Sequence, residues 1–232
     1  MPVQDEPTVT LLLRHGQTPM SVQKRYAGTS DVPLTEAGVQ QAAAAARRLG
    51  SAGIGAIVTS PLRRAVRTAH EVATVTGVPV AADDGFREID FGAWEGLTFA
   101  EVRQRWPAEL RAWLRDPAAA PPGGESLAEA SERVSAALHR VLAGFQRQTV
   151  LIVSHVTPIK ALVAAALLAP PAALHRMHLD VAALCEIDWY ADGPAVLRSF
   201  NDTSHLGWDL GPQPPRLVRH RYRGGGPAAP PR

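Results

Sequence analysis

The stretch Thr8-Val-Thr-Leu-Leu-Leu-Arg-His-Gly16 decides the fold class of this chain. Residues 8–13 are apolar or β-branched, a composition that predicts a buried strand. Arg14 and His15 follow this strand directly. In open α/β sheets, ligands bind beyond the carboxyl ends of the strands. We therefore expect an α/β protein whose site is built from the residues that come after each strand.

Further strands are predicted from short apolar runs bounded by turn residues. They are expected at 56–59, 149–153, 183–190 and 195–200, with extended segments at 78–80 and 86–91. The last two strands are joined at Asp192-Gly193, which predicts a C-terminal β-hairpin.

Helices alternate with these strands. A Ser/Thr N-cap followed by proline predicts helix starts at Ser60-Pro61 and at Thr157-Pro158. Capping boxes begin at Thr98 and Ser126, and a further helix is expected over 35–50. The alternation predicts a single α/β domain over residues 8–205, with a largely parallel central sheet flanked by helices.

Charge is distributed unevenly along the chain. The 232 residues include 24 Lys and Arg against 22 Asp and Glu, a formal net charge of +2. Five arginines and no acid lie in 211–232, a Pro/Gly/Arg-rich segment that we expect to be a disordered tail, and the rest of the chain carries −3. Such a tail predicts only weak, salt-sensitive contact with nucleic acid. Tyr222 is its one aromatic side chain, which argues against base stacking.

The sequence carries no signal for secretion or membrane insertion. Residues 1–7 contain two acids and no apolar signal-peptide core. The longest apolar run, 161–174, is interrupted by Pro170-Pro171 and is too short to cross a bilayer. A single cysteine, Cys185, excludes an internal disulfide and a Cys-based zinc cluster. We expect a cytoplasmic protein with no membrane contact, no metal and no further domain ahead of the first strand.

Chemically active side chains follow three of the predicted strands. Besides Arg14 and His15, Arg64 lies shortly after the second strand, and His155 lies after 149–153. Their convergence at one sheet edge would form a site for a dianion such as phosphate. Arg64 falls in the first turn of its predicted helix, where a cation opposes the helix dipole, and a bound anion would remove that conflict.

A carboxylate beside a phosphate site is unfavourable unless it takes part in proton transfer. The segment Phe86-Arg-Glu-Ile-Asp-Phe-Gly92 supplies two candidates, Glu88 and Asp90. The sequence therefore predicts a phosphoryl-transfer site with an acid–base group.

These residues resemble the sequence blocks of the histidine phosphatase superfamily, the phosphoglycerate-mutase-like family. The likeness covers about residues 8–205 and is most similar to the α-ribazole phosphatase and broad-specificity phosphatase branch. Six blocks carry it in the family's order: Leu13-Arg-His-Gly16 with Thr18; Pro33-Leu-Thr35 with Gly38 and Gln41-Ala42; Ser60-Pro-Leu62 with Arg64-Ala65 and Thr68-Ala69; Glu88 with Phe91-Gly92 and Trp94-Glu-Gly96; Gly123-Gly-Glu-Ser126; and Ser154-His155.

The resemblance implies a metal-independent phosphomonoester hydrolase that needs no cofactor and acts through a phosphohistidine. The substrate implied is a small phosphorylated metabolite such as α-ribazole 5′-phosphate. In the family pattern His15 is the nucleophile and is neutral, Glu88 is the general acid and base, and a cationic His155 helps to surround the phosphoryl group. Contacts to the substrate are then expected from Arg14, Gln17, Thr18, Ser21, Arg64 and Val156, with the pocket wall formed by 26–31 and 94–126.

Two positions depart from the family pattern. Ser21 stands where asparagine is usual, and Val156-Thr157 stands where two glycines are common. A cofactor-dependent phosphoglycerate mutase is the alternative within the family, although the short loop 123–126 is of the phosphatase type. From another class, the alternatives are a nucleic-acid-binding protein and a catalytically inactive binding protein. The sequence leaves open whether the chain forms a homodimer.

Overall fold

Six strands form one sheet in the order β3-β2-β4-β1-β5-β6. Strands β3, β2, β4 and β1 are parallel to one another, and β5 and β6 add an antiparallel hairpin at one edge. The expected largely parallel sheet with a C-terminal hairpin is confirmed. The bounds are β1 (Thr8–Arg14), β2 (Ile54–Thr59), β3 (Val80–Ala82), β4 (Thr149–Ser154), β5 (Leu184–Trp189) and β6 (Ala195–Asp202).

The computed structural model describes residues 6–207, so the expected tail at 211–232 lies outside them. Within that range, no helix is long and apolar enough to cross a membrane. The α-helices are α1 (Pro19–Val22), α2 (Glu36–Leu49), α3 (Arg63–Thr76), α4 (Phe99–Arg105), α5 (Pro107–Trp113), α6 (Leu127–Gly144) and α7 (Val156–Ala166). Short 3₁₀ turns lie at Asp84–Phe86, Gly92–Trp94, Pro171–Arg176 and Ser204–Leu206.

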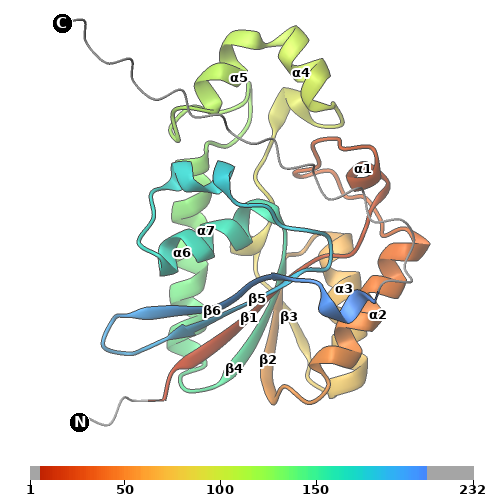
Figure 1. Ribbon diagram of the computed structural model, residues 1–232, viewed down its shortest axis with the longest axis vertical. Coiled ribbons are helices and arrows are strands. Elements are labelled where there is room, and N and C mark those ends of the chain that lie inside the picture. The colour runs from red at the N-terminus through yellow and green to blue at the C-terminus, as the bar shows by residue number, and fades with distance from the viewer. Residues whose placement is uncertain (1–5, 208–232) are drawn as a thin grey trace, which may run out of the picture.

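Helices cover both faces of the sheet (Figure 1). Because successive side chains of a strand point to opposite faces, Leu12 joins the cluster that contains α6 and α7. Its neighbours Leu11 and Leu13 join the cluster that contains α2 and α3. The apolar run 8–13 is therefore continuous because the strand is buried on both sides.

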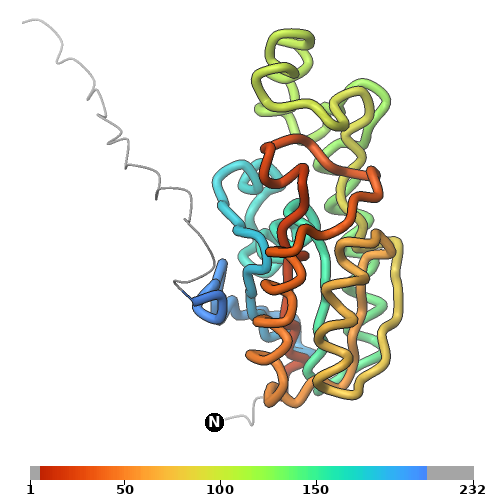
Figure 2. Tube along the Cα trace, turned by 90° about the vertical axis from the view of Figure 1, so that its right-hand side faces the viewer, coloured from red at the N-terminus to blue at the C-terminus, as the bar shows by residue number. Residues whose placement is uncertain are grey.

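The central strands end at the same level, which gathers the residues that follow them. Arg14 of β1 is in register with Ser154 of β4, and Thr59 of β2 with Val153 of β4. In both views α1, α4 and α5 lie beyond this carboxyl edge, at the top of the molecule (Figures 1 and 2). The edge is thus flanked by helices that can close a pocket over it.

Local capping signals predicted three helix starts correctly. Thr35 caps α2, and Thr98 and Ser126 form capping boxes with Glu101 and Glu129. Each of these caps is made by residues close in sequence, so the sequence pattern was sufficient.

Two predicted helix starts were wrong, each by two residues. Helix α3 starts at Arg63 with Leu62 as its N-cap, and Ser60 Oγ accepts from Leu62 N at 3.3 Å and lies 2.7 Å from His155 Nε2. Helix α7 starts at Val156, two residues earlier than expected, with His155 as its N-cap. The consequence is that residues 60 and 155 are held at the sheet edge, facing the site.

The segment 86–91, expected to be extended, is not a strand. It leaves the 3₁₀ turn Asp84–Phe86 and enters the turn Gly92–Trp94. Ser154 Oγ donates to Phe86 O at 2.6 Å, which ties this irregular segment to the end of β4. Glu88 is thereby placed beside the sheet edge by a loop.

Candidate active site

His15 continues the end of β1 at the carboxyl edge of the sheet. Its backbone N–H donates to Ser154 O at 3.0 Å. The side chain is 5% exposed and lines a cavity, and Nδ1 lies 2.8 Å from Gly16 O. A carbonyl oxygen only accepts hydrogen bonds, so Nδ1 carries the proton and Nε2 keeps its lone pair.

The environment of His15 keeps its imidazole neutral. Burial lowers the pKa of His15 well below its usual value, and the positive charges of Arg14 and Arg64 lower it further. A neutral ring with an available lone pair is the form that a histidine nucleophile needs. The structure thus gives His15 the protonation state that the resemblance implies.

His155 lies against His15, with ring centroids 5.0 Å apart. Nε of Arg64 donates to Nδ1 of His155 at 3.2 Å, so the proton of His155 is on Nε2 and is donated to Ser60 Oγ. Burial and the charge of Arg64 lower the pKa of His155 well below its usual value. The expectation that His155 is cationic is therefore wrong for this structure. The pKa values of His15 and His155 are both lowered, so they are not pushed apart.

Arg64 is 1% exposed, and its hydrogen bonds go mainly to a loop of the protein. Besides the His155 contact, Nη1 donates to Ser30 O at 2.7 Å, and Nη2 donates to Gly28 O at 2.8 Å and Ala27 O at 3.1 Å. Arg64 does not line the cavity. Here it acts as a buried clamp on loop 27–30 and on His155.

Glu95 binds the N–H groups of the same loop. Its carboxylate accepts from Gly28 N at 2.8 Å, from Thr29 N at 3.0 Å and from Ser30 Oγ at 2.5 Å. Loop 27–30 therefore has its N–H groups bound by Glu95 and its carbonyls bound by Arg64. This pairing gives a physical reason for the Trp94-Glu-Gly96 sequence block, whose role the sequence alone did not reveal.

The N-termini of α3 and α7, where the sequence predicted phosphate binding, both bind protein carboxylates. Asp31 Oδ1 accepts from Arg63 N at 2.8 Å at the start of α3. Glu88 accepts from Val156 N at 3.0 Å and from Thr157 N at 3.1 Å at the start of α7. The anion expected near Arg64 is thus supplied by the protein, through Asp31, Glu95 and Glu88, whose charges all act on Arg64.

Glu88 is the carboxylate that reaches the cavity. It is 5% exposed, lines the cavity and also accepts from Ile89 N at 2.9 Å. The competing carboxylate, Asp90, accepts from Gly92 N at 2.8 Å and is not among the lining residues. Position therefore favours Glu88 as the acid–base group.

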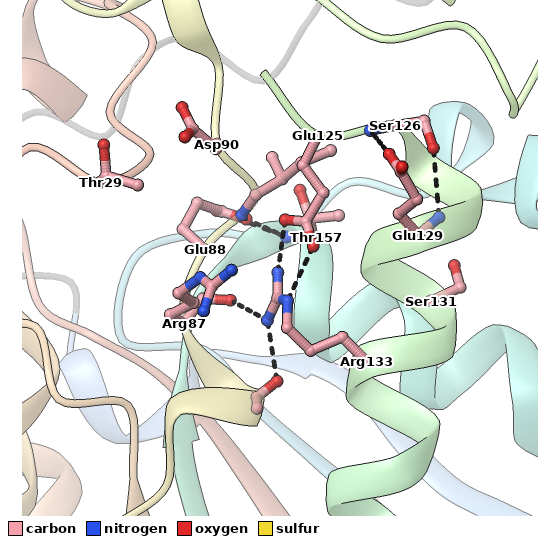
Figure 3. A network of polar contacts seen from close by, with 12 residues as sticks. Thr29, Arg87, Glu88, Asp90, Glu125, Ser126, Glu129, Ser131, Arg133 and Thr157 are labelled. Atoms are coloured by element: carbon pink, nitrogen blue, oxygen red, sulfur yellow. Dashed lines mark hydrogen bonds and ion pairs between the residues drawn. The ribbon is translucent and has the colours of Figure 1, made fainter. Parts of the chain in front are cut away.

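Arg133 of α6 fixes the segment that carries Glu88 (Figure 3). Its guanidinium donates to Gly85 O at 2.9 Å and to Arg87 O at 3.0 Å. It also forms a two-pronged ion pair with Glu125, at 2.8 and 2.7 Å. Sequence reasoning missed this clamp, because it joins the Gly123–Ser126 block to α6 and to the loop before Glu88.

Arg14 supplies the positive charge nearest the nucleophile along the chain. Nη1 donates to Leu179 O at 2.7 Å, and Nε is buried without a hydrogen-bond partner in the part of the chain that the structure describes. Burial lowers the pKa of Arg14 to about 10, so it stays protonated near neutral pH. A buried donor without a partner on a cavity wall is suited to an anion.

The cavity has a volume of about 260 Å³. Its wall includes three of the five residues expected to be catalytic, Arg14, His15 and Glu88, while Arg64 and His155 lie behind it. Within residues 6–207 no group of three or more His, Cys, Asp and Glu side chains could hold a metal ion. The remaining lining residues are Thr18, Ser21, Arg25, Tyr26, Ala27, Phe91, Trp113, Leu127, Val156, Thr157, Lys160, Leu174 and His175.

The residues expected to contact substrate are only partly placed at the cavity. Thr18 and Ser21 line it, but they also form the capping box of α1 with each other. Val156 lines it as well, although its N–H is committed to Glu88. Gln17 is absent from the wall, since its backbone N–H donates to Gln41 at 2.8 Å and its side chain accepts from Thr35 at 2.9 Å.

A close backbone contact seats the His15 loop on α2. A Cβ on Gly16 would overlap Gly38 O, and a Cβ on Gly38 would overlap Gln17 O. Only glycine permits this approach at both positions. The pair explains why glycine stands at these two places in the first two sequence blocks.

Several wall residues were not predicted from sequence. The expected wall, 26–31 and 94–126, contributes Tyr26, Ala27 and Trp113. Lys160 was missed, although helical spacing could have found it, because it lies four residues after Val156 on α7. Leu174 and His175 gave no local signal, since they reach the wall through a turn far along the chain.

A known protein family matches most of this chain. The model of the Histidine phosphatase superfamily (branch 1) matches residues 10–203. The chain belongs to the histidine phosphatase superfamily. The six sequence blocks and the cluster around His15 thus lie within a histidine phosphatase domain.

Relatives of this histidine phosphatase domain have different lengths. It is 48% identical over 201 residues to bifunctional protein Rv2228c of Mycobacterium tuberculosis, covering 86% of this chain and 55% of that protein. The chain thus spans about half the length of the first curated relatives that it matches. It is 33% identical over 198 residues to phosphoserine phosphatase 1 of Hydrogenobacter thermophilus, covering 85% of this chain and 93% of that one. The solved structure of mycobacterial glucosyl-3-phosphoglycerate phosphatase with VO3 matches with a TM-score of 0.78 at 33% identity, over 84% of this chain and 100% of that chain.

Proposed function

We propose that this histidine phosphatase domain hydrolyses a small phosphomonoester through a covalent intermediate on Nε2 of His15, without a metal ion. The observation that carries the proposal is the state of His15: neutral, held through Nδ1 by Gly16 O, and on the wall of a cavity that Arg14 and Glu88 share. These are a nucleophile, a phosphate-binding cation and an acid–base group in one place.

In the first half-reaction, Nε2 of His15 attacks phosphorus and the bond from phosphorus to the alkoxy oxygen breaks. Glu88, in its protonated form, donates a proton to that oxygen, and the alcohol leaves. Arg14 stabilises the negative charge of the equatorial oxygens, and the Gly16 carbonyl stabilises the positive charge that develops on the imidazole.

In the second half-reaction, a water molecule attacks the phosphohistidine. Glu88, now a carboxylate, removes a proton from this water, and the bond from phosphorus to Nε2 breaks. Inorganic phosphate and neutral His15 are regenerated, and Glu88 is protonated again. Arg64 and His155 act from behind the wall in this scheme, by fixing loop 27–30 and the His15 ring.

The size of the cavity points to a small leaving group. Its volume of about 260 Å³ is below the roughly 300–1,000 Å³ of pockets that enclose drug-sized ligands. α-Ribazole 5′-phosphate is the candidate that the sequence resemblance suggests, and Tyr26, Phe91 and Trp113 are the wall residues that would contact its ring system. A screen decides between this compound and smaller phosphoesters.

The proposal is tested by phosphate release from a panel of phosphomonoesters, with and without chelator. We expect hydrolysis of at least one member that is unchanged by EDTA and lost in His15→Asn. Asn also preserves a polar group at this position, so a folded, inactive variant identifies the imidazole as essential. Hydrolysis that needs added magnesium would contradict the proposal, and transfer of phosphate between phosphoglycerates without net release would favour the mutase alternative.

A further inference from the structure

Lys160 is a cation on the cavity wall that the proposed reaction does not use. It lies on α7, four residues after Val156 and three after Thr157, whose backbone N–H groups hold Glu88. Residues three and four apart lie on the same face of a helix. Lys160 is therefore on the face of α7 that looks toward Glu88 and the cavity.

The side chain of Lys160 makes no hydrogen bond or ion pair with another residue of 6–207. Burial lowers the pKa of its ammonium group, the negative charge of Glu88 raises this pKa, and the positive charge of Arg14 lowers it. By contrast, Arg25 on the same wall is paired with Glu101 at 3.1 Å and donates to Gly96 O at 2.7 Å. The ammonium group of Lys160 is thus the available cation beyond Arg14.

Apart from Glu88, the lining of the cavity among the described residues includes no acidic side chain that would balance the charge of Lys160. Phe91, Trp113, Leu127 and Leu174 are apolar, and burial lowers the pKa of His175, which contacts Trp113 with ring centroids 4.7 Å apart. A partly buried ammonium ion beside apolar side chains is stabilised when a ligand brings an opposite charge.

We infer that Lys160 binds a carboxylate on the leaving group, so that the preferred substrates of this domain are small phosphorylated carboxylic acids. The inference rests on the proposed phosphatase function. The phosphoryl group lies at Arg14 and His15, the ester oxygen lies at Glu88, and the next part of the leaving group lies beside Lys160.

A single carboxylate fits this wall better than a second phosphate. An arginine side chain binds phosphate through two hydrogen bonds, whereas Lys160 is a single point charge. In the part of the chain that the structure describes, no arginine free of protein partners lies beside it to add a second contact. A second dianion would bring more negative charge than the single ammonium group of Lys160 balances. One negative charge matches the one available cation.

Two pairs of phosphoesters test the inference. In each pair one member has a carboxylate where the other has a neutral group. Phosphoglycolate is compared with ethyl phosphate, and 3-phosphoglycerate with glycerol 3-phosphate. We expect the wild-type chain to favour the acid in each pair by roughly 10-fold to 100-fold in kcat/KM, the range of one hydrogen bond to a charged group. Lys160→Met should bring this ratio close to one, and Lys160→Arg should restore most of it.

Lys24→Met is the matched control, because Lys24 is the other lysine of the chain and is exposed outside the cavity wall. It should keep the wild-type ratio. The inference is wrong if the wild-type chain hydrolyses both members of each pair equally, or prefers α-ribazole 5′-phosphate, and the proposed phosphatase function then stands. An equal loss on acid and neutral members in Lys160→Met, with the ratio unchanged, also overturns it and shows that Lys160 acts through Glu88. If no phosphomonoester is hydrolysed, the proposed function fails and the inference falls with it.

Discussion

Nε of Arg64 donates to Nδ1 of His155 at 3.2 Å, and this contact decides which nitrogen of His155 carries the proton. With Nδ1 as the acceptor, Nε2–H is donated to Ser60 Oγ at 2.7 Å. The chain Arg64–His155–Ser60 is buried behind His15, so the orientation of the second histidine depends on the arginine.

Arg64→Lys should therefore weaken both the fold and catalysis. Lysine keeps the charge but cannot donate at once to His155 and to the carbonyls of Ala27, Gly28 and Ser30. Leaving buried carbonyls unsatisfied should lower the free energy of unfolding by roughly 2–4 kcal/mol. We expect kcat to fall about 10²-fold, as for loss of one group that organises charge stabilisation. Urea unfolding and initial rates measure the two effects, and wild-type values for both would contradict the clamp.

Arg133 should affect catalysis by positioning Glu88. Arg133→Gln leaves Glu125 unpaired, with its side chain 14% exposed, and frees the carbonyls of Gly85 and Arg87. We expect a loss of roughly 2–4 kcal/mol in the free energy of unfolding and a lower kcat on alkyl phosphates. The drop should be smaller on p-nitrophenyl phosphate, whose leaving group needs no proton.

The matched control for Arg133 lies on the same helix. Arg140 pairs with Asp83 at 2.8 Å, but its side chain is 58% exposed. Arg140→Gln should leave stability and rates nearly unchanged. Equal effects of the two substitutions would show that Arg133 is not special for Glu88.

Stability should fall as the pH drops below about 6.5, the ordinary histidine value. Since the pKa values of His15 and His155 are lowered in the folded protein, the unfolded chain binds more protons in this range, and protonation favours unfolding. Each histidine contributes a slope of up to roughly 1.4 kcal/mol per pH unit. Urea unfolding between pH 5 and 7.5 should show a shallower slope in His15→Asn than in the wild type. An identical slope would mean that His15 is not held neutral, and His70→Asn, at an exposed position of α3, is the control.

Glu88 and Asp90 are distinguished by the leaving group. Glu88→Gln should lose roughly 10²-fold to 10⁴-fold in rate on alkyl phosphates, the range of one acid–base group. On p-nitrophenyl phosphate the first half-reaction should suffer less, so a burst of nitrophenol should precede slow turnover. Asp90→Asn, whose carboxylate caps the turn at Gly92, should show neither effect. Leaving-group dependence in Asp90→Asn alone would move the acid role to Asp90.

The fold was predictable because its signals are local. The run 8–13 is apolar throughout, and Thr98 and Ser126 cap helices with glutamates three residues away. The start of α7 was not predictable, because Glu88, distant in sequence, accepts from Val156 N and Thr157 N and so caps the helix two residues ahead of the predicted start.

The site was predictable as a set of residues but not as a network. His15, Arg14 and Glu88 follow from strand ends and family blocks, and the structure places them on one cavity wall. Arg64 binds loop carbonyls and does not line the cavity. These hydrogen bonds join residues 34 to 37 positions apart, and no local sequence pattern predicts them. The neutral state of His155 likewise depends on burial, which only the folded chain reveals.

The covalent phosphohistidine on His15 can be trapped and located. Glu88→Gln, which should accumulate the intermediate, is mixed with p-nitrophenyl phosphate, quenched at alkaline pH because phosphohistidine is acid-labile, and digested for mass spectrometry. We expect one phosphate per chain, located on His15, in the same amount as the nitrophenol burst. A phosphate on His155 or on another residue, or a burst without any phosphorylated peptide, would contradict it.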